Sequence, residues 1–183
     1  MRPAVVGVVA GLLGSAVAAS QGESQEKPTI FVAAGPAFPM VDKGDYGDPG
    51  WFSYAGVNVP VGSRGLRVGG NLVYGRNKHS YVAGDKANLL GFFGFWQYRL
   101  GNPAKPGIYV VNVAGALNHQ YKIARPSAFG DQGGWKAAFG GGVGVDIPAG
   151  RVGIFIEFLF IARGDTRFLP LAAGMSFPFG KTK

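Results

Sequence analysis

Apolar residues alternate with small or polar residues at a period of two along much of the chain. Between 135 and 147, for instance, Trp135 and Phe139 share one face, whereas Lys136 and Asp146 share the other. The clearest segments of this kind are 66–75, 135–147, 151–163 and 166–179. Successive side chains of a strand point to opposite faces, whereas a helix needs a period near 3.6. The pattern therefore predicts strands that are apolar on one face.

Four further segments alternate less clearly, and they are 29–38, 51–61, 88–100 and 107–121. Segment 88–100 is apolar on both faces, and we assign Gln97 and Arg99 to the inward face. In segment 107–121 we assign the polar face inward, and this face carries Asn112, Asn118 and Gln120. The opposite face is apolar and is expected to point outward, with Tyr109, Val111, Val113 and Leu117. All eight segments are close to the 9–11 residues that a tilted membrane strand needs.

The connections between these segments alternate in length. Short ones are expected at 60–64, 101–106 and 148–150, and longer ones at 39–50, 76–86 and 122–134. The seventh, Gly164-Asp165, is short and departs from the alternation. Short periplasmic turns and longer outer loops are typical of bacterial barrels. The fold class expected is all-β, an eight-stranded antiparallel up-and-down transmembrane β-barrel.

The aromatic residues form two groups when the strands are run up and down from a periplasmic N-terminus. The outer group is Trp51, Tyr74, Tyr121 and Trp135, and the inner group is Trp96, Tyr98, Tyr109, Phe177 and Phe179. Amphipathic rings favour the two headgroup levels of a bilayer. A soluble sandwich or lipocalin-like barrel is the alternative, but it would turn its apolar faces inward and scatter its aromatic residues.

The N-terminus has the three parts of a secretory signal peptide. Arg2 supplies a positive charge, an apolar or small run extends from Ala4 to Ala19, and Ala16-Val17-Ala18 matches the cleavage pattern. We expect a signal peptide at 1–19, a flexible periplasmic lead-in at 20–28 and the barrel domain at 29–180. A membrane anchor helix is the alternative, but the run is short for a span. Only helices and closed barrels satisfy every backbone hydrogen bond in lipid, so a chain that spans the membrane without apolar helices must form a closed barrel.

Composition narrows the function classes. Charged residues make up 15% of the 183 residues, against about 25% in soluble domains. The absence of cysteine excludes disulfides and cysteine nucleophiles. The net charge of +8 suits the phosphates of outer-membrane lipid and lipopolysaccharide. Nucleic acid is not an expected partner, because binding would need basic residues interleaved with accessible stacking aromatics, and here the aromatics belong to belts.

The inward face is expected to carry a polar network in a lumen just wide enough to be filled by side chains. Its members are Arg67, Asn71, Arg99, Asn112, Lys136, Asp146, Arg151, Glu157 and Arg163. Buried charges must be paired, so Asp146 and Glu157 are interpreted as ion-pair partners of inward arginine and lysine. A narrow path for small or hydrophobic solutes is the functional alternative.

No catalytic, cofactor or metal residue is expected. A lipid A-modifying enzyme would need a serine, a histidine base and a carboxylate, and neither His79 nor His119 has a suitable serine beside it. The acidic stretch Asp42–Asp48 lacks the spacing of a calcium loop. The glycine-rich run Gly140–Gly144 continues a strand pattern, so its small residues are interpreted as room for side chains that fill the lumen.

Two stretches carry a resemblance to a known family. Residues 51–60 with 65–70 resemble the first long hairpin of the small outer-membrane barrels of the OmpA, OmpX and OmpW kind. Gly174, Phe177 and Phe179 are similar to the C-terminal signal that the barrel-assembly machinery reads. The resemblance implies location in the cell outer membrane, but it does not fix the function, because this fold hosts several functions. Separately, we expect a monomer without enzymatic activity that has a structural, envelope-integrity or surface-interaction role through its outer loops.

Overall fold

The computed structural model describes residues 27–40, 49–62, 65–78, 86–102, 105–122, 133–164 and 166–180. The expected signal peptide, His79 and the acidic stretch Asp42–Asp48 lie outside these ranges. Within them, no helix is long and apolar enough to cross a membrane.

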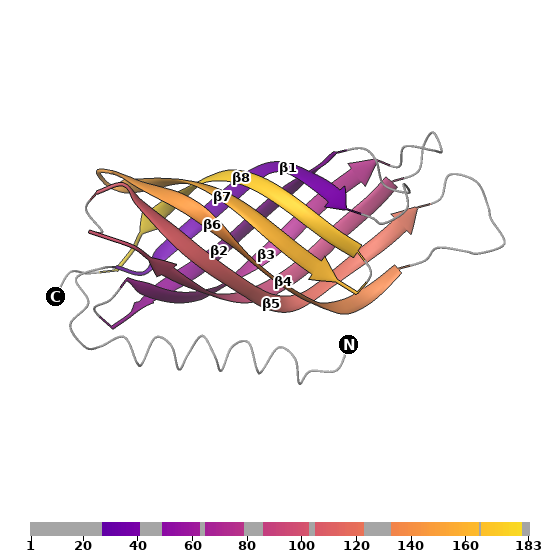
Figure 1. The fold of residues 1–183 in the computed structure, drawn as a ribbon, viewed down its shortest axis with the longest axis horizontal. Helices are drawn as coiled ribbons and strands as arrows, with labels where there is room; N and C mark the ends of the chain where they lie inside the picture. The colour runs from indigo at the N-terminus through magenta and orange to yellow at the C-terminus, as the bar shows by residue number, and fades with distance from the viewer. Residues whose placement is uncertain are drawn as a thin grey trace.

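Eight strands close into a single barrel in which every neighbouring pair is antiparallel (Figure 1). They are β1 Thr29–Met40, β2 Gly50–Val61, β3 Leu66–Lys78, β4 Lys86–Arg99, β5 Gly107–Lys122, β6 Gly133–Ala149, β7 Val152–Arg163 and β8 Thr166–Pro178. β1 pairs with β8, with Ile30 opposite Phe177, so no strand is left as an edge. The expected fold class and the count of eight are confirmed.

The two ends of the barrel differ in their connections. Tight turns join β2 to β3 and β6 to β7, and Gly62, Gly65 and Gly150 adopt the positive φ that such turns require. We call this the short-turn end; β1 begins there, and Phe179 donates a backbone hydrogen bond to Pro28 there. The expected length alternation is weaker than the sequence indicated, because β3 extends to Lys78 and shortens the connection to β4.

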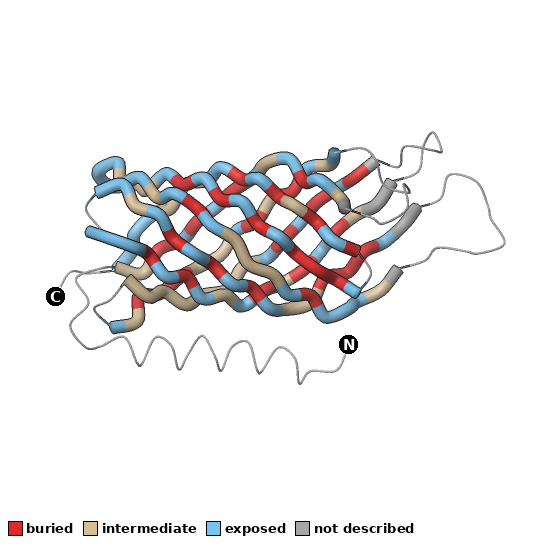
Figure 2. Tube along the Cα trace, viewed as in Figure 1, coloured by how far each residue is buried: buried red, intermediate tan, exposed pale blue. Residues whose placement is uncertain are grey.

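The outer surface of the barrel is apolar. Exposed and buried residues alternate along the strands (Figure 2), and the exposed set includes Leu72 and Phe139 with 68% and 64% of their surface accessible. Where the structure describes the side chains of the strands, the outward-facing charged residues Arg76 and Arg167 lie near the end opposite the short turns. An apolar band of this extent on a closed barrel is a surface for lipid rather than water.

The lumen contains a larger apolar core than the sequence indicated. Its buried side chains are Phe31, Ala33, Ala37, Phe52, Tyr54, Val73, Leu89, Phe93, Tyr109, Val111, Val113, Leu117, Ala138, Phe155, Leu159, Ile161, Phe168 and Ala172. The assignment of β5 was therefore wrong, because its apolar face of Tyr109, Val111 and Val113 points inward and Asn112 is exposed. Both faces of β5 are largely apolar, so the few polar residues on one of them were a poor guide to orientation.

Candidate functional site in the barrel lumen

The half of the lumen away from the short turns is closed by a layer of almost fully buried side chains. This layer, the outer plug, consists of Phe52, Leu89, Leu117, Ile161 and Phe168. Arg163 lies at the same end, where its Nε donates to the Leu117 carbonyl at 2.8 Å and its Nη2 to the Gly134 carbonyl at 2.6 Å. His119 packs edge-on against Phe168, with 5.9 Å between the ring centroids.

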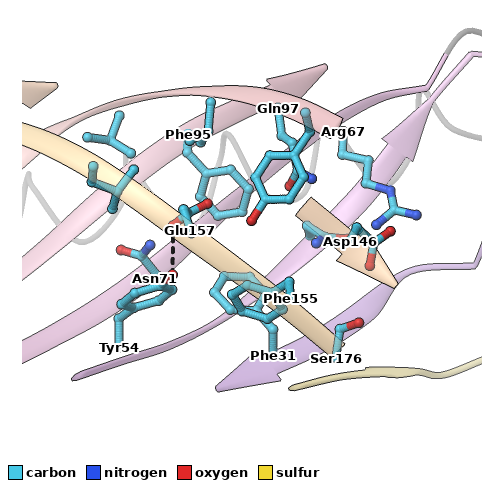
Figure 3. A pocket seen from close by; sticks show the side chains of 15 residues that line it. Phe31, Tyr54, Arg67, Asn71, Phe95, Gln97, Asp146, Phe155, Glu157 and Ser176 are labelled. Atoms are coloured by element: carbon cyan, nitrogen blue, oxygen red, sulfur yellow. Dashed lines mark hydrogen bonds between the residues drawn. The ribbon is translucent and has the colours of Figure 1, made fainter. Parts of the chain in front are cut away.

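The half toward the short turns holds a cavity of about 40 Å³ (Figure 3). Its lining is polar and aromatic: Phe31, Tyr54, Asn58, Arg67, Asn71, Phe95, Gln97, Tyr109, Val111, Val113, Asp146, Phe155, Glu157, Leu159 and Ser176. One water molecule needs a cavity volume of roughly 10–15 Å³. The cavity therefore has room for about three water-sized groups. The outer plug lies between this cavity and the opposite end of the barrel.

Glu157 of β7 is the buried carboxylate of this cavity, with 8% of its surface exposed. The Tyr54 hydroxyl donates to its Oε1 at 2.6 Å (Figure 3), and the Tyr109 hydroxyl also hydrogen-bonds to the carboxylate. The three residues come from β2, β5 and β7, so this contact joins strands from different parts of the barrel wall. The expected ion pair of Glu157 was wrong, since both hydrogen-bond partners are neutral hydroxyls.

Glycines on neighbouring strands make room for the rings that line the cavity. A Cβ at Gly144, which pairs with Tyr109, would lie 2.2 Å from Cζ of that ring. A Cβ at Gly56, Gly69 or Gly174 would lie 2.7, 2.6 or 2.4 Å from Cζ of Phe31, Phe95 or Phe155, respectively. Real Cβ atoms do not approach so closely, so each ring occupies space that its glycine leaves open.

Charged and polar contacts gather at the rim of the short-turn end. Arg99 Nε lies 3.0 Å from Asp146 Oδ2, and another guanidinium nitrogen of Arg99 donates to the Lys105 carbonyl. The expected pairing of Asp146 with an inward arginine is therefore present. Thr29 Oγ1 donates to Asn58 Oδ1 at 2.7 Å across β1 and β2. These contacts tie the ends of strands that are distant in sequence.

The structure separates the residues expected to form one network. Arg67, Asn71, Asp146 and Glu157 line the cavity, and Arg99 pairs with Asp146 beside it. Arg163 lies instead at the opposite end, as does Lys136, which shares the inward register of Ala138 but is exposed. Placement in the lumen was wrong for Asn112, which is exposed on the outer face, and for Arg151, which is exposed in the β6–β7 turn.

Tyr54 and Tyr109 are the functional residues that the sequence interpretation missed. Tyr109 was placed in the inner aromatic belt, whereas it is 2% exposed and lies in the lumen. Tyr54 had no assigned role. Its position gave a usable signal, because it lies near the middle of a strand, away from both headgroup levels where outward tyrosines are favoured.

Comparison with known proteins finds similar solved structures but no similar sequences. No family model matches the chain, and no curated protein sequence matches it. Among solved structures, Neisserial surface protein A aligns with a TM-score of 0.67 at 14% identity, over 86% of this chain and all of that one. Ail, the attachment invasion locus protein of Yersinia pestis, aligns with 0.57 at 14% identity, over 85% and 100%. The N-terminal β-barrel domain of Pseudomonas aeruginosa OprF aligns with 0.54 at 15% identity, over 84% and 98%.

The chain has the fold of the small outer-membrane β-barrels. The resemblance stated from the hairpin and C-terminal residues is therefore confirmed for the fold. This fold and the apolar exterior together place the protein in the outer membrane. In an outer-membrane barrel the short-turn end faces the periplasm, and the outer plug lies toward the cell surface.

Most residues of the two expected aromatic belts lie on the lipid-facing surface of this outer-membrane barrel. Trp51 and Tyr74 pack edge-on with centroids 5.2 Å apart near the outer end, and Trp135 packs on Phe92 at 5.7 Å. Trp96, Tyr98, Phe177 and Phe179 are exposed in the periplasmic half. The side chain of Tyr121 is outside the described set. Tyr109 is the residue for which the belt assignment was wrong.

Tyr54→Phe should lower the free energy of unfolding of the barrel by about 1.5–3 kcal/mol, because it removes a hydrogen bond to a buried carboxylate. The measurement is urea unfolding of the refolded protein in lipid vesicles. Tyr74→Phe is the matched control, since it removes a hydroxyl from an exposed belt residue, and its effect should stay within about 0.5 kcal/mol. Equal effects of the two variants would show that the Glu157 contact adds no stability.

Proposed function

We propose that this protein is a non-enzymatic, non-conducting outer-membrane barrel that serves envelope integrity or surface interaction by holding its outer connections at the cell surface. The observation that carries this proposal is the outer plug. Phe52, Leu89 and Leu117 are almost fully buried across the lumen, and this burial supports a lumen without a continuous water path. A barrel closed in this way acts as a rigid scaffold for the segments between its strands.

The outer end offers chemistry for partners at the surface. Arg76 and Arg167 are exposed at strand ends on this side. Guanidinium groups bind phosphate with paired hydrogen bonds, so outer-leaflet lipid and lipopolysaccharide are the partners we propose for this rim. During biogenesis, Gly174, Phe177 and Phe179 would serve as the signal for the barrel-assembly machinery. Both rings are exposed at the periplasmic end, which supports such a contact.

The position of His119 supports a role without catalysis. Its ring is 1% exposed and packs against Phe168 inside the lumen. A histidine base for acyl transfer has to reach both a nucleophile and the substrate. A ring enclosed by the outer plug has no access to the acyl chains of membrane lipid.

The purified protein should show no conductance steps in planar lipid bilayers. Phe52→Ala combined with Phe168→Ala serves as the matched variant, because it removes two rings of the outer plug and should allow small steps to appear. Discrete steps from the wild-type protein, reproduced at the same amplitude across preparations, would contradict the proposal and favour a narrow pore.

A further inference from the structure

The cavity on the periplasmic side of the outer plug has a chemistry that the scaffold role does not use. Glu157, Tyr54 and Asn71 lie together at its inner part (Figure 3), and rings from five different strands line it. We propose that this cavity binds a small primary ammonium group, held by the Glu157 carboxylate and by the faces of the surrounding aromatic rings.

The polar atoms of the cavity favour a ligand that donates hydrogen bonds. The Glu157 carboxylate accepts from two tyrosine hydroxyls, and an ionised carboxylate offers about four acceptor positions. The Oδ1 atom of Asn71, which also lines the cavity, is buried without a hydrogen-bond partner among the described residues. Buried acceptors normally have a donor, so this atom indicates a missing donor in the space beside it. An ammonium group carries three N–H donors.

The aromatic walls favour a cation over a neutral donor. Phe31 lies edge-on to Tyr54, Phe95 and Phe155, with centroids 6.0, 5.6 and 6.3 Å apart. Cations are attracted to the negative faces of such rings, more strongly when water is excluded. Three glycines keep open the space for the rings of Phe31, Phe95 and Phe155, so the arrangement is built into the barrel wall rather than left by loose packing.

The size and charge of the cavity limit the ligand further. A volume of about 40 Å³ admits a group such as methylammonium and excludes a large organic cation. Asp146 at the periplasmic rim is already paired with Arg99, whereas the hydrogen bonds that the structure describes for Glu157 come from neutral tyrosine hydroxyls. The acidic group that remains for a cation is therefore the deeper one. Arg67 also lines the cavity, and its positive charge repels an ammonium group, so the ammonium group has to lie at the inner part, away from Arg67.

Methylammonium labelled with ¹³C is a direct probe of this site. The full mature chain, refolded in detergent micelles, would be titrated with methylammonium chloride, with sodium chloride at the same ionic strength as reference. We expect saturable binding, with nuclear Overhauser contacts from the probe methyl to ring protons of Phe31, Phe95 and Phe155. The proposal would be overturned if the probe showed contacts only to surface rings such as Trp96. It would also be overturned if sodium ions displaced bound methylammonium as well as unlabelled methylammonium does.

Two isosteric variants distinguish the contribution of the Glu157 carboxylate to binding from that of the Asp146 carboxylate at the rim. Glu157→Gln should weaken methylammonium binding about tenfold or more, because it removes the charge while it keeps an oxygen for Tyr54. Asp146→Asn should change binding by about twofold or less, since that carboxylate already pairs with Arg99. Equal binding by wild type and Glu157→Gln would overturn the proposal. If Glu157→Gln does not fold, the contact pattern in the wild-type protein decides alone. The result is independent of conductance, so the scaffold role is tested separately.

Discussion

Leu72→Arg should lower the free energy of unfolding of the lipid-embedded barrel by about 2–4 kcal/mol. Leu72 is the most exposed large apolar residue described, with 68% of its surface accessible, and it lies in the middle of β3. An arginine there would face hydrocarbon near the centre of the membrane. The measurement is reversible unfolding by guanidinium chloride in phospholipid vesicles, followed by tryptophan fluorescence.

The matched control for this substitution is Leu100→Arg. Leu100 is also exposed, at 52%, but it follows the last residue of β4 at the periplasmic end. A charge near the interface costs only about 0–1 kcal/mol. On the surface of a soluble protein both substitutions would stay within about 0.5 kcal/mol. Equal small effects would therefore contradict a lipid-facing surface at Leu72.

Gly140→Ala should destabilise the barrel by about 3 kcal/mol, because the backbone of the neighbouring strand leaves no space for the added methyl group. A Cβ at Gly140 would lie 2.0 Å from the Phe160 carbonyl oxygen and 3.0 Å from Ile161 Cα. Both contacts are backbone atoms of the paired strand β7, so the strands themselves would have to move apart. Denaturant unfolding in vesicles measures the loss.

Gly94→Ala is the control, because Gly94 lies on the exposed outer face of β4 and no atom lies closer than 3.9 Å to an added Cβ. Its effect should stay within about 0.5 kcal/mol. If the two variants lost equal stability, the cost would come from strand propensity in general and not from the close approach of the β7 backbone to Gly140.

The alternation of side chains made most of the fold predictable. In β7, Ile154, Ile156 and Phe158 are exposed and Glu157 is buried, as the period of two indicated. β5 failed because both of its faces are largely apolar, with Ile108 and Val110 on one and Tyr109 and Val111 on the other. Which face points inward depends on what fills the lumen, and that is set by the other seven strands.

The candidate site was predictable only in part. The pairing of Asp146 with an inward arginine follows from the rule that buried charges need partners, and Arg99 supplies it. The contacts of Glu157 with Tyr54 and Tyr109 do not follow, because they depend on the register of strands far apart in the sequence. The glycine-rich run of β6 was interpreted as room for lumen side chains, and the contact of Tyr109 with Gly144 shows which ring uses that room.

The most direct test of a lipid-embedded barrel is cell fractionation combined with gel mobility before and after boiling. A closed barrel in the outer membrane should be recovered with that membrane and should migrate faster in an unboiled sample, because the folded barrel survives the detergent and is more compact than the unfolded chain. Recovery in the soluble periplasm, with the same mobility before and after boiling, would contradict the membrane barrel.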